Sequence, residues 1–152
     1  MFLDASTFKT VIEFTPLISI DLIVQNLDGK ILLGKRNNAP AKDFWFVPGG
    51  RILKDELMEV AFIRLAQEEL GLDIALSDAK FLGAYEHFYD DCVFSSEIST
   101  HYVVLAYSLQ LQRSLINLPT KQHRDYRWFS PQEMLNNRKV HRHSTAYLAA
   151  LD

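Results

Sequence analysis

The sequence has few of the residues that cross-link or divide a chain. It contains a single cysteine, Cys92, so an intrachain disulfide cannot form, and a reducing compartment is expected. Its six glycines and five prolines are scattered, and no linker, repeat or low-complexity tract separates one part from another. Because one hydrophobic core commonly organises roughly 100–150 residues, we predict a single domain over residues 1–152.

Positive charge and long apolar runs are also scarce. Sixteen Lys and Arg against nineteen Asp and Glu give a net charge of −3, whereas a general nucleic-acid binder carries a basic excess. Residues 17–24 are interrupted by Asp21 and fall far short of the ~20 apolar residues that cross a bilayer. Residues 1–14 lack the basic start and apolar stretch of a signal peptide. We expect a cytoplasmic protein that binds neither nucleic acid nor membrane.

The chain does contain short β-rich runs around one strong helical segment. Asp28-Gly29 lies between two such runs and predicts a hairpin. Ser130-Pro131-Gln132-Glu133 has the form of a capping box, and Asp4 or Ser6 can cap a first helix. The pattern predicts an α+β fold in which hairpins join most strands. The expected strands cover residues 17–26, 30–36, 44–47, 80–90, 99–111 and 125–129, and the expected helices cover 4–14, 55–70 and 143–151.

The segment 50–72, GRILKDELMEVAFIRLAQEELGL, carries the most informative pattern. Glu68 and Glu69 are adjacent on the predicted helix and cannot both point the same way, so one can face a pocket while the other pairs with Arg64. An isolated acidic pair would most simply be an exposed helix face. Carboxylates also suit Mg²⁺, however, and the preceding Pro-Gly-Gly turn brings bare backbone close enough for a carbonyl to add a ligand.

The complete spacing resembles the Nudix box: Gly, five residues, Glu, seven residues, then Arg-Glu-aliphatic-x-Glu-Glu-x-Gly-aliphatic. One position departs, because Leu65 stands where the pattern has a Glu that usually helps to hold metal or to activate water. Either fewer metal ions bind and water is activated elsewhere, or the protein is not a standard pyrophosphohydrolase. The matching positions are Gly50, Glu56, Arg64, Ala66, Glu68, Glu69, Gly71 and Leu72.

Further stretches, LLGKR, WFVPGGR, HFYDD, THYVVL and QHRDYRWF, are similar to the GDP-mannose mannosyl hydrolase branch of the Nudix superfamily. That branch lacks the same Glu, so Leu65 is expected there. The resemblance implies the Nudix fold, an α/β/α sandwich with a mixed sheet and a loop-helix-loop box. It also implies hydrolysis of GDP-mannose, and of GDP-glucose, to GDP and the free sugar. In that reaction water attacks the anomeric carbon with inversion.

The resemblance implies one Mg²⁺ per subunit, with Mn²⁺ as an alternative. Its protein ligands would be the carbonyl of Gly49, the carboxylate of Glu69 and the side-chain oxygen of Gln122. A cation on the diphosphate makes GDP a better leaving group. Whether Glu68 also touches the metal is left open by the sequence.

The resemblance also assigns catalytic roles. Arg36 and Arg51 would hold the leaving phosphates, since guanidinium groups bind phosphate in a bidentate way. Tyr102 would donate a hydroxyl proton to the same phosphates, and His123 would be the general base, because imidazole accepts protons near neutral pH. Asp21 would position sugar hydroxyls or stabilise developing positive charge, although strand alternation also allows it to face solvent.

The substrate-binding residues implied in the same way begin at the N-terminus. Phe2, Leu3 and Phe8 are apolar for a chain end and would contact guanine, unless they only pack on the sheet. His87 would contact the diphosphate or the sugar, and Arg36 the phosphates. The resemblance implies a homodimer. Residues 138–152 show no recognisable chemistry.

Three functions therefore remain. The first is the nucleotide-sugar glycosyl hydrolase. The second is a Nudix pyrophosphatase that cuts the phosphoanhydride of a nucleotide sugar or related nucleoside diphosphate derivative, and the third is a catalytically weak binding domain. Leu65 and the Gln122-His123 pair favour the first, and the intact Glu56, Arg64 and Glu69 argue against the third. The sequence does not distinguish mannose, glucose and fucose, nor does it fix the physiological metal.

Overall fold

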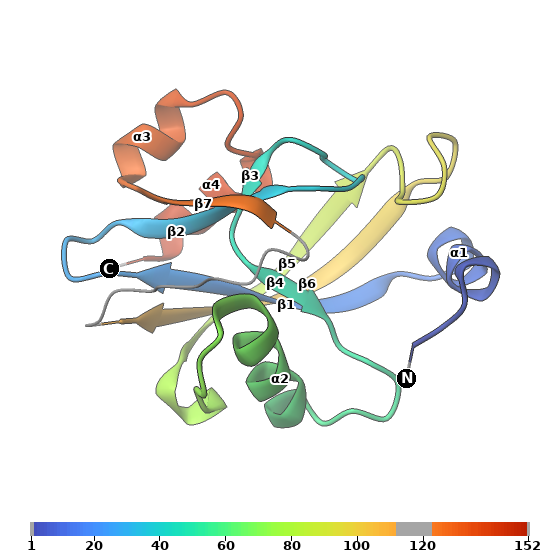
Figure 1. Cartoon of the computed structure of the whole chain (residues 1–152), viewed down its shortest axis with the longest axis horizontal. Coiled ribbons are helices and arrows are strands. Elements are labelled where there is room, and N and C mark those ends of the chain that lie inside the picture. The colour runs from blue at the N-terminus through green and yellow to red at the C-terminus, as the bar shows by residue number, and fades with distance from the viewer. Residues whose placement is uncertain (1, 112–122, 152) are drawn as a thin grey trace.

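Short strands make up one central sheet with helices on both of its faces (Figure 1). The computed structural model describes residues 2–111 and 123–151, with the backbone alone for residues 123 and 124. The strands are β1 (Leu17–Gln25), β2 (Ile31–Arg36), β3 (Trp45–Phe46), β4 (Gly49–Arg51), β5 (Lys80–Tyr89), β6 (Thr100–Gln110) and β7 (His123–Phe129). The helices are α1 (Ala5–Phe14), α2 (Met58–Leu70), η1 (Leu76–Asp78), α3 (Pro131–Asn136), α4 (Arg142–Thr145) and η2 (Ala146–Ala150).

The centre of the sheet is β1. It runs parallel to β6 from Leu17↔Tyr102 to Gln25↔Gln110, and β6 pairs antiparallel with β5. The path through the described strands is β3-β2-β1-β6-β5, with β4 also on β1 and β7 also on β2. Gly29 has a φ of 75° in the turn between β1 and β2, the conformation that glycine adopts without steric cost. The predicted hairpin and the mixed sheet are both confirmed.

The sheet divides after this hairpin, and the division makes room for a site. The register of β2 on β1 is limited to Gln25↔Ile31, after which β2 continues along β7 and β3. Further along β1, β4 takes the neighbouring place, from Ser19↔Arg51 to Asp21↔Gly49. The Gly-Gly backbone of β4 therefore lies directly beside Asp21.

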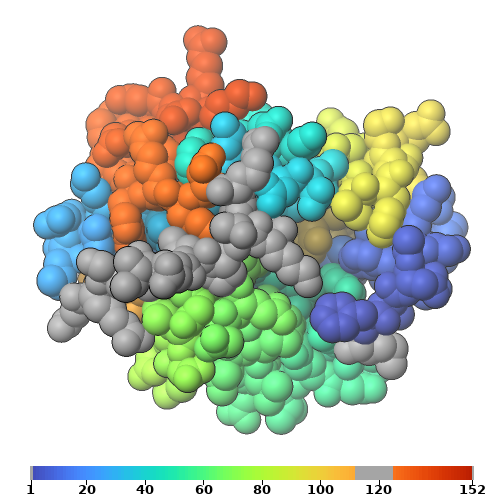
Figure 2. Space-filling model, in the orientation of Figure 1, coloured from blue at the N-terminus to red at the C-terminus, as the bar shows by residue number. Residues whose placement is uncertain are grey.

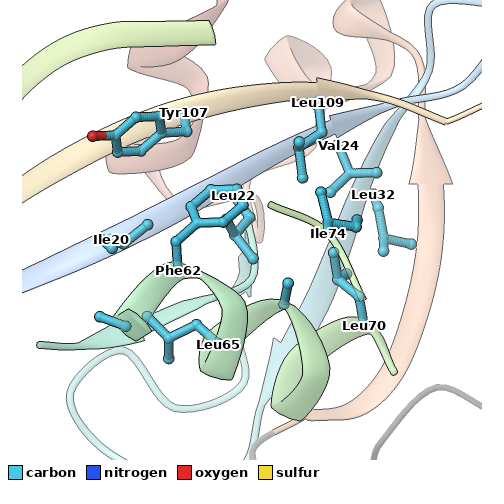
Figure 3. Close-up of a cluster of buried hydrophobic side chains, with 12 residues drawn as sticks. Ile20, Leu22, Val24, Leu32, Phe62, Leu65, Leu70, Ile74, Tyr107 and Leu109 are labelled. Carbon is cyan, nitrogen blue, oxygen red and sulfur yellow. The ribbon is translucent and has the colours of Figure 1, made fainter. Parts of the chain in front are cut away.

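Two apolar layers hold the helices to the sheet. Because side chains alternate along a strand, Ile20, Leu22 and Val24 face α2, where they meet Phe62 and other side chains of the helix (Figure 3). The opposite layer packs the C-terminal helices onto the sheet. Burying one such side chain contributes roughly 1.5–3 kcal/mol. The second layer consists of Ile23, Ile31, Leu33, Val47, Ala106, Phe129, Met134, Val140 and Tyr147.

The helix ends follow local capping chemistry, with two corrections. Asp4 caps α1, and Ser130 with Glu133 forms the predicted capping box of α3. The helix predicted from residue 55 begins only at Met58, because Asp55 has a φ of 65° and cannot start a helix. The C-terminal helix predicted over residues 143–151 consists instead of the shorter α4 and η2. Among the described helices, none has the length and apolar composition needed to cross a bilayer.

Candidate active site

A cavity of about 230 Å³ lies between the β1–β4 pair, the end of β2 and the last residues of β5. A larger hollow of about 620 Å³, between the end of β5 and the C-terminal helices, shares only Tyr89 with this cavity among the described residues. Three charged side chains that were predicted to belong to the site, Asp21, Arg36 and Arg51, line the smaller cavity. Seven of the predicted site residues line it: Phe8, Asp21, Arg36, Gly49, Arg51, His87 and Tyr102.

Strand alternation explains why these side chains point the same way. Asp21 lies on the sheet face that carries the C-terminal helices, opposite to the face that α2 covers. His87 on β5 is directly opposite Tyr102 on β6, so both share that face. Tyr89, two residues after His87, lines the cavity as well, although the sequence analysis gave it no role. The period-2 spacing from His87 was the signal that could have identified it.

Close backbone approach explains the two glycines at the start of β4. A Cβ on Gly49 would lie 2.4 Å from Oδ1 of Asp21, and a Cβ on Gly50 would lie 2.4 Å from Cδ2 of Leu65. Both distances are shorter than any side chain tolerates, so the strand passes between Asp21 on one side and the helix on the other only because these positions are bare. The double glycine thus brings the backbone of Gly49 to the cavity wall.

Arg64 organises the segment 50–72, called the box segment below. It donates to both oxygens of Glu56, to the carbonyl of Arg51 and, at 3.1 Å, to Glu68. The predicted pairing of Arg64 with one of the two adjacent acids is therefore present, and Glu68 is the partner. The Glu68 side chain is 47% exposed, whereas Glu69 is 3% exposed. Glu68 thus pairs with Arg64 at the surface, whereas Glu69 is buried.

Burial changes the pKa of several groups in or near the cavity. It raises the pKa of Asp21 to about 7, against the opposing effects of a hydrogen bond from Tyr147 and of Arg36. Burial lowers the pKa of His87 to about 3, helped by His143 and His141, so this imidazole is neutral. Burial also raises the pKa of the Tyr102 hydroxyl. The tyrosine is then a proton donor at any physiological pH.

Two guanidinium groups bring positive charge to the cavity. Arg36 lies over the Phe46 ring at 5.7 Å, and Arg51 lies over the Phe8 ring at 4.3 Å. Such cation–π contacts orient the guanidinium plane while leaving its N–H groups available for phosphate oxygens. Phe8 therefore contacts Arg51, the arginine predicted to hold a phosphate, and its predicted contact with a base stays a prediction.

The N-terminal residues line a second hollow of about 460 Å³, which shares Phe8, Gly50 and Arg51 with the cavity. Phe2 and Leu3 belong to this second hollow, together with Glu68 and Glu69. Figure 2 shows the N-terminal segment, in dark blue, bordering the green box segment. The predicted base-binding residues thus lie in the hollow next to the cavity, and Arg51 lies between the two.

The oxygen donors fit a hard divalent cation. Burial, followed by the negative charge of Glu68, raises the pKa of Glu69 to about 8. A nearby cation would therefore be needed to stabilise the ionised form of this carboxylate at neutral pH. The described residues hold no group of three or more His, Cys, Asp or Glu side chains suited to a metal. A site with one carboxylate, a backbone carbonyl and an amide oxygen would suit Mg²⁺, which keeps its other positions for water and phosphate.

Two predicted residues are described incompletely. The backbone of His123 opens β7 directly opposite Arg36 on β2, which places this position at the strand end nearest to the cavity. Gln122, the predicted amide ligand, lies outside the described residues. Residues 138–152, in which the sequence showed no recognisable chemistry, contribute Tyr147, which donates to Asp21. Its contact spans 126 positions, so local sequence could not reveal it.

Comparison with known proteins gives a family and several relatives. The family model of the NUDIX domain matches residues 15–150. The chain is 36% identical over 145 residues to the low-salt glycan biosynthesis protein Agl8 of Haloferax volcanii, covering 95% of this chain and 88% of that protein. It is 42% identical over 57 residues to the ADP-ribose pyrophosphatase of Methanocaldococcus jannaschii, covering 38% of this chain and 33% of the other.

Solved structures share the fold. A MutT NUDIX hydrolase from Burkholderia pseudomallei superposes with a TM-score of 0.71 at 25% identity, over 91% of this chain and 99% of that one. The NUDIX domain of Shewanella oneidensis NrtR, crystallised with ADP ribose, gives 0.70 at 18% identity, over 97% and 90% of the two chains. With the box segment, the mixed sheet between helices and the match over residues 15–150, the chain belongs to the Nudix hydrolase family.

Proposed function

We propose that this protein hydrolyses a nucleoside diphosphate sugar, GDP-mannose and also GDP-glucose, by water attack at the anomeric carbon. The burial of Leu65 carries the proposal. This side chain occupies the box position where a Glu usually serves metal or water, yet it is 1% exposed and belongs to the core beneath β4. Glu56 and Glu68 both bind Arg64, so Glu69 is the buried carboxylate of the box.

The charge distribution suits a departing nucleoside diphosphate. When the bond between the sugar carbon and its phosphate oxygen breaks, the electron pair leaves with the diphosphate. Arg36, Arg51 and the Tyr102 hydroxyl line the cavity where this negative charge would develop. A divalent cation held by the Gly49 carbonyl, Glu69 and Gln122 would, when bound, neutralise a further part of the charge.

At the sugar, the charge that develops is positive. The anomeric carbon becomes positive as the leaving group departs, and Asp21 supplies a carboxylate on the same cavity wall as His87. The water oxygen forms a bond to this carbon, and His123 accepts the proton that the water loses. The products are the nucleoside diphosphate and the sugar with inverted configuration. Because the backbone of His123 pairs with Arg36, the proposed base lies next to one of the proposed diphosphate-binding residues.

Cleavage of the phosphoanhydride is the second candidate, and the comparisons favour it. One relative is named an ADP-ribose pyrophosphatase, and a structural neighbour was crystallised with ADP ribose. This reaction would put water on phosphorus and release a nucleoside monophosphate with a sugar phosphate. It also needs water activated beside the metal, where this chain has Leu65. The name of the Haloferax relative, a glycan biosynthesis protein, suits a nucleotide sugar in either reaction.

Hydrolysis in ¹⁸O-labelled water separates the candidates. We expect the label on the free sugar, detected by mass spectrometry, and an unlabelled nucleoside diphosphate. The anomer released first, followed by proton NMR, should be β from an α-linked substrate. Label on a released nucleoside monophosphate or sugar phosphate would establish the pyrophosphatase instead. Absence of product with GDP-mannose, GDP-glucose and ADP-ribose would leave a binding domain, and Glu69→Ala prepared in parallel controls for contaminating hydrolases.

The expected homodimer stays a prediction, which sedimentation velocity can check.

A further inference from the structure

Three polar groups from distant parts of the chain meet behind the sugar end of the cavity. The hydroxyl of Tyr147 lies 2.5 Å from Oδ2 of Asp21 and 3.3 Å from Nε2 of His87. Tyr147 is 1% exposed and belongs to η2, whereas Asp21 lies on β1 and His87 on β5. Asp21 and His87 line the cavity, and Tyr147 contacts both without lining it.

The number of protons available fixes the direction of these hydrogen bonds. An ionised Asp21 can only accept, so the single proton of the Tyr147 hydroxyl is donated to it. Its oxygen can then only accept from His87, which requires the proton of the neutral imidazole to be on Nε2. The bonds thus run from His87 through Tyr147 to Asp21, and Nδ1 of His87 keeps the lone pair.

The segment that carries Tyr147 is anchored on both sides of the cavity. The buried hydroxyl of Ser144 accepts from the backbone N–H of Val47, just before β4. The ring of His143 stacks on the ring of His87, with centroids 4.1 Å apart and planes within 7°. The ring of Tyr147 meets Tyr85 edge-on at 4.8 Å. These contacts hold the Tyr147 hydroxyl in place before any substrate arrives.

The Asp21 carboxylate is held between two neighbours. Its Oδ2 accepts from Tyr147, while its Oδ1 lies so close to Gly49 that a Cβ there would be at 2.4 Å. The hydrogen bond from Tyr147 therefore holds one carboxylate oxygen, while the other lies beside the bare backbone of Gly49. Without the hydroxyl of Tyr147, Oδ2 would lose this donor, and the half-buried carboxylate would be held less firmly.

We propose that Tyr147 is a positioning residue, whose hydroxyl fixes both the orientation of the Asp21 carboxylate and the Nε2–H tautomer of His87. The C-terminal segment 142–150 thereby determines which hydrogen-bond acceptors the cavity offers to the hydroxyls of the sugar. The consequence for sugar hydrolysis rests on the proposed function, whereas the tautomer of His87 does not depend on it.

Histidine tautomers can be read directly by long-range ¹H–¹⁵N NMR of ¹⁵N-labelled protein, with His87→Gln used to assign the signals. The spectrum should be recorded above the pKa of about 7 of Asp21. We expect His87 to be protonated on Nε2 alone in the wild type, and Tyr147→Phe, which keeps the ring, to give a mixture of the two tautomers. A wild-type His87 that is already mixed, or protonated on Nδ1, overturns the proposal even if the variant fails to fold. An unchanged spectrum in a folded Tyr147→Phe protein does the same.

Kinetics test the consequence at the sugar. We expect Tyr147→Phe to lower kcat for GDP-mannose by about 10–100-fold, the loss typical of residues that orient other site residues. The inhibition constant of GDP should change less than about 3-fold, because GDP has no sugar and occupies only the diphosphate-binding part. Tyr85→Phe is the matched control, since it removes a hydroxyl from the ring next to Tyr147, and it should keep wild-type kcat.

The tautomer spectrum and the kinetics together distinguish a failure of the proposed function from a failure of the positioning role. If the wild type hydrolyses no nucleotide sugar while the tautomer of His87 depends on Tyr147, the proposed function is wrong and the positioning contact stands. If the wild type is active but Tyr147→Phe keeps its kcat, Tyr147 does not serve the reaction. Equal losses in kcat and in GDP affinity would indicate general damage to the fold, which also contradicts a positioning role.

Discussion

Arg64 holds Glu56 through two parallel hydrogen bonds, from Nε to Oε2 at 2.7 Å and from Nη2 to Oε1 at 2.9 Å. The same Nη2 donates to the carbonyl of Arg51 at 2.8 Å, and Glu56 accepts from the backbone of Leu53 at 3.0 Å. The pair thus closes the loop between β4 and α2. Because the Glu56 side chain is 11% exposed, solvent screens this contact less than a surface ion pair. The ion pair is linked to the cavity by the hydrogen bond from Arg64 to the backbone carbonyl of Arg51, because Arg51 lines the cavity.

We expect Glu56→Gln to destabilise the fold by about 1–3 kcal/mol at neutral pH, because hydrogen bonds to the charged carboxylate are weakened. The pKa of Glu56 is lowered, chiefly by the hydrogen bonds from Arg64, so its stabilising effect is present above the pKa of an unfolded Glu and is lost as the pH falls through the lower folded pKa. Urea denaturation from pH 7 downwards should therefore show the wild type and the variant converging in acid. The exposed Glu86→Gln is the control, and parallel pH curves for wild type and Glu56→Gln would contradict the assignment.

Leu65 should not be convertible into the missing box carboxylate. Leu65→Glu would place a charge at a position that is 1% exposed and packed against Gly50, at a cost of roughly 3–5 kcal/mol. We expect a large fall in melting temperature and no nucleoside monophosphate among the products. Leu65→Met, which keeps the volume, should stay near wild type in both respects. A stable Leu65→Glu protein that cuts the phosphoanhydride would mean that this side chain can reach the substrate.

Local patterns were sufficient for much of the fold. The Asp28-Gly29 turn, the Gly71 helix end and the Ser130 capping box each depend on residues a few positions apart, and each lies where it was predicted. The helical spacing is local as well, and it predicted that Arg64 pairs with one of the two adjacent acids, which the structure shows to be Glu68. Features that depend on a single helical turn or a single hairpin could therefore be predicted from the sequence.

Long-range contacts set the limit of that approach. Asp21 could equally have faced solvent by strand alternation alone, and only its contacts with Tyr147 and Gly49 show that it is half-buried in the cavity lining. The contribution of residues 138–152 was missed because Tyr147 has no nearby partner that would mark it. The late start of α2 depends on the positive φ of Asp55, a conformation that non-glycine residues seldom adopt and that residue type did not reveal.

Activity should require a divalent cation bound through Glu69. Complete chelation should abolish hydrolysis, and Glu69→Gln should lower kcat/KM by about 100-fold or more, beyond the loss typical of residues that only orient a ligand. Added Mg²⁺ should raise the melting temperature of the wild type, since a ligand that binds only the folded state stabilises it. The variant should show no such rise. Glu68→Gln, at the exposed neighbouring position, should keep both the activity and the response to Mg²⁺. Full activity after chelation would refute the metal-dependent scheme.

His123→Ala tests how water is activated. Leu65 is buried where the box pattern has a Glu next to Arg64, and the backbone of His123 lies opposite Arg36, so we expect His123 to be the base. Removing a general base typically lowers kcat by 10²–10⁴-fold, and we expect a loss in that range while the dissociation constant for GDP-mannose changes less than about 3-fold. Calorimetry on the slow variant gives the binding constant directly. His101→Gln is the control, because His101 stacks on Phe88, on the sheet face opposite to His87 and Tyr102. Because substrate binding is measured separately from turnover, a variant that binds and still hydrolyses at the wild-type rate would remove His123 from the mechanism and require another base near Arg36.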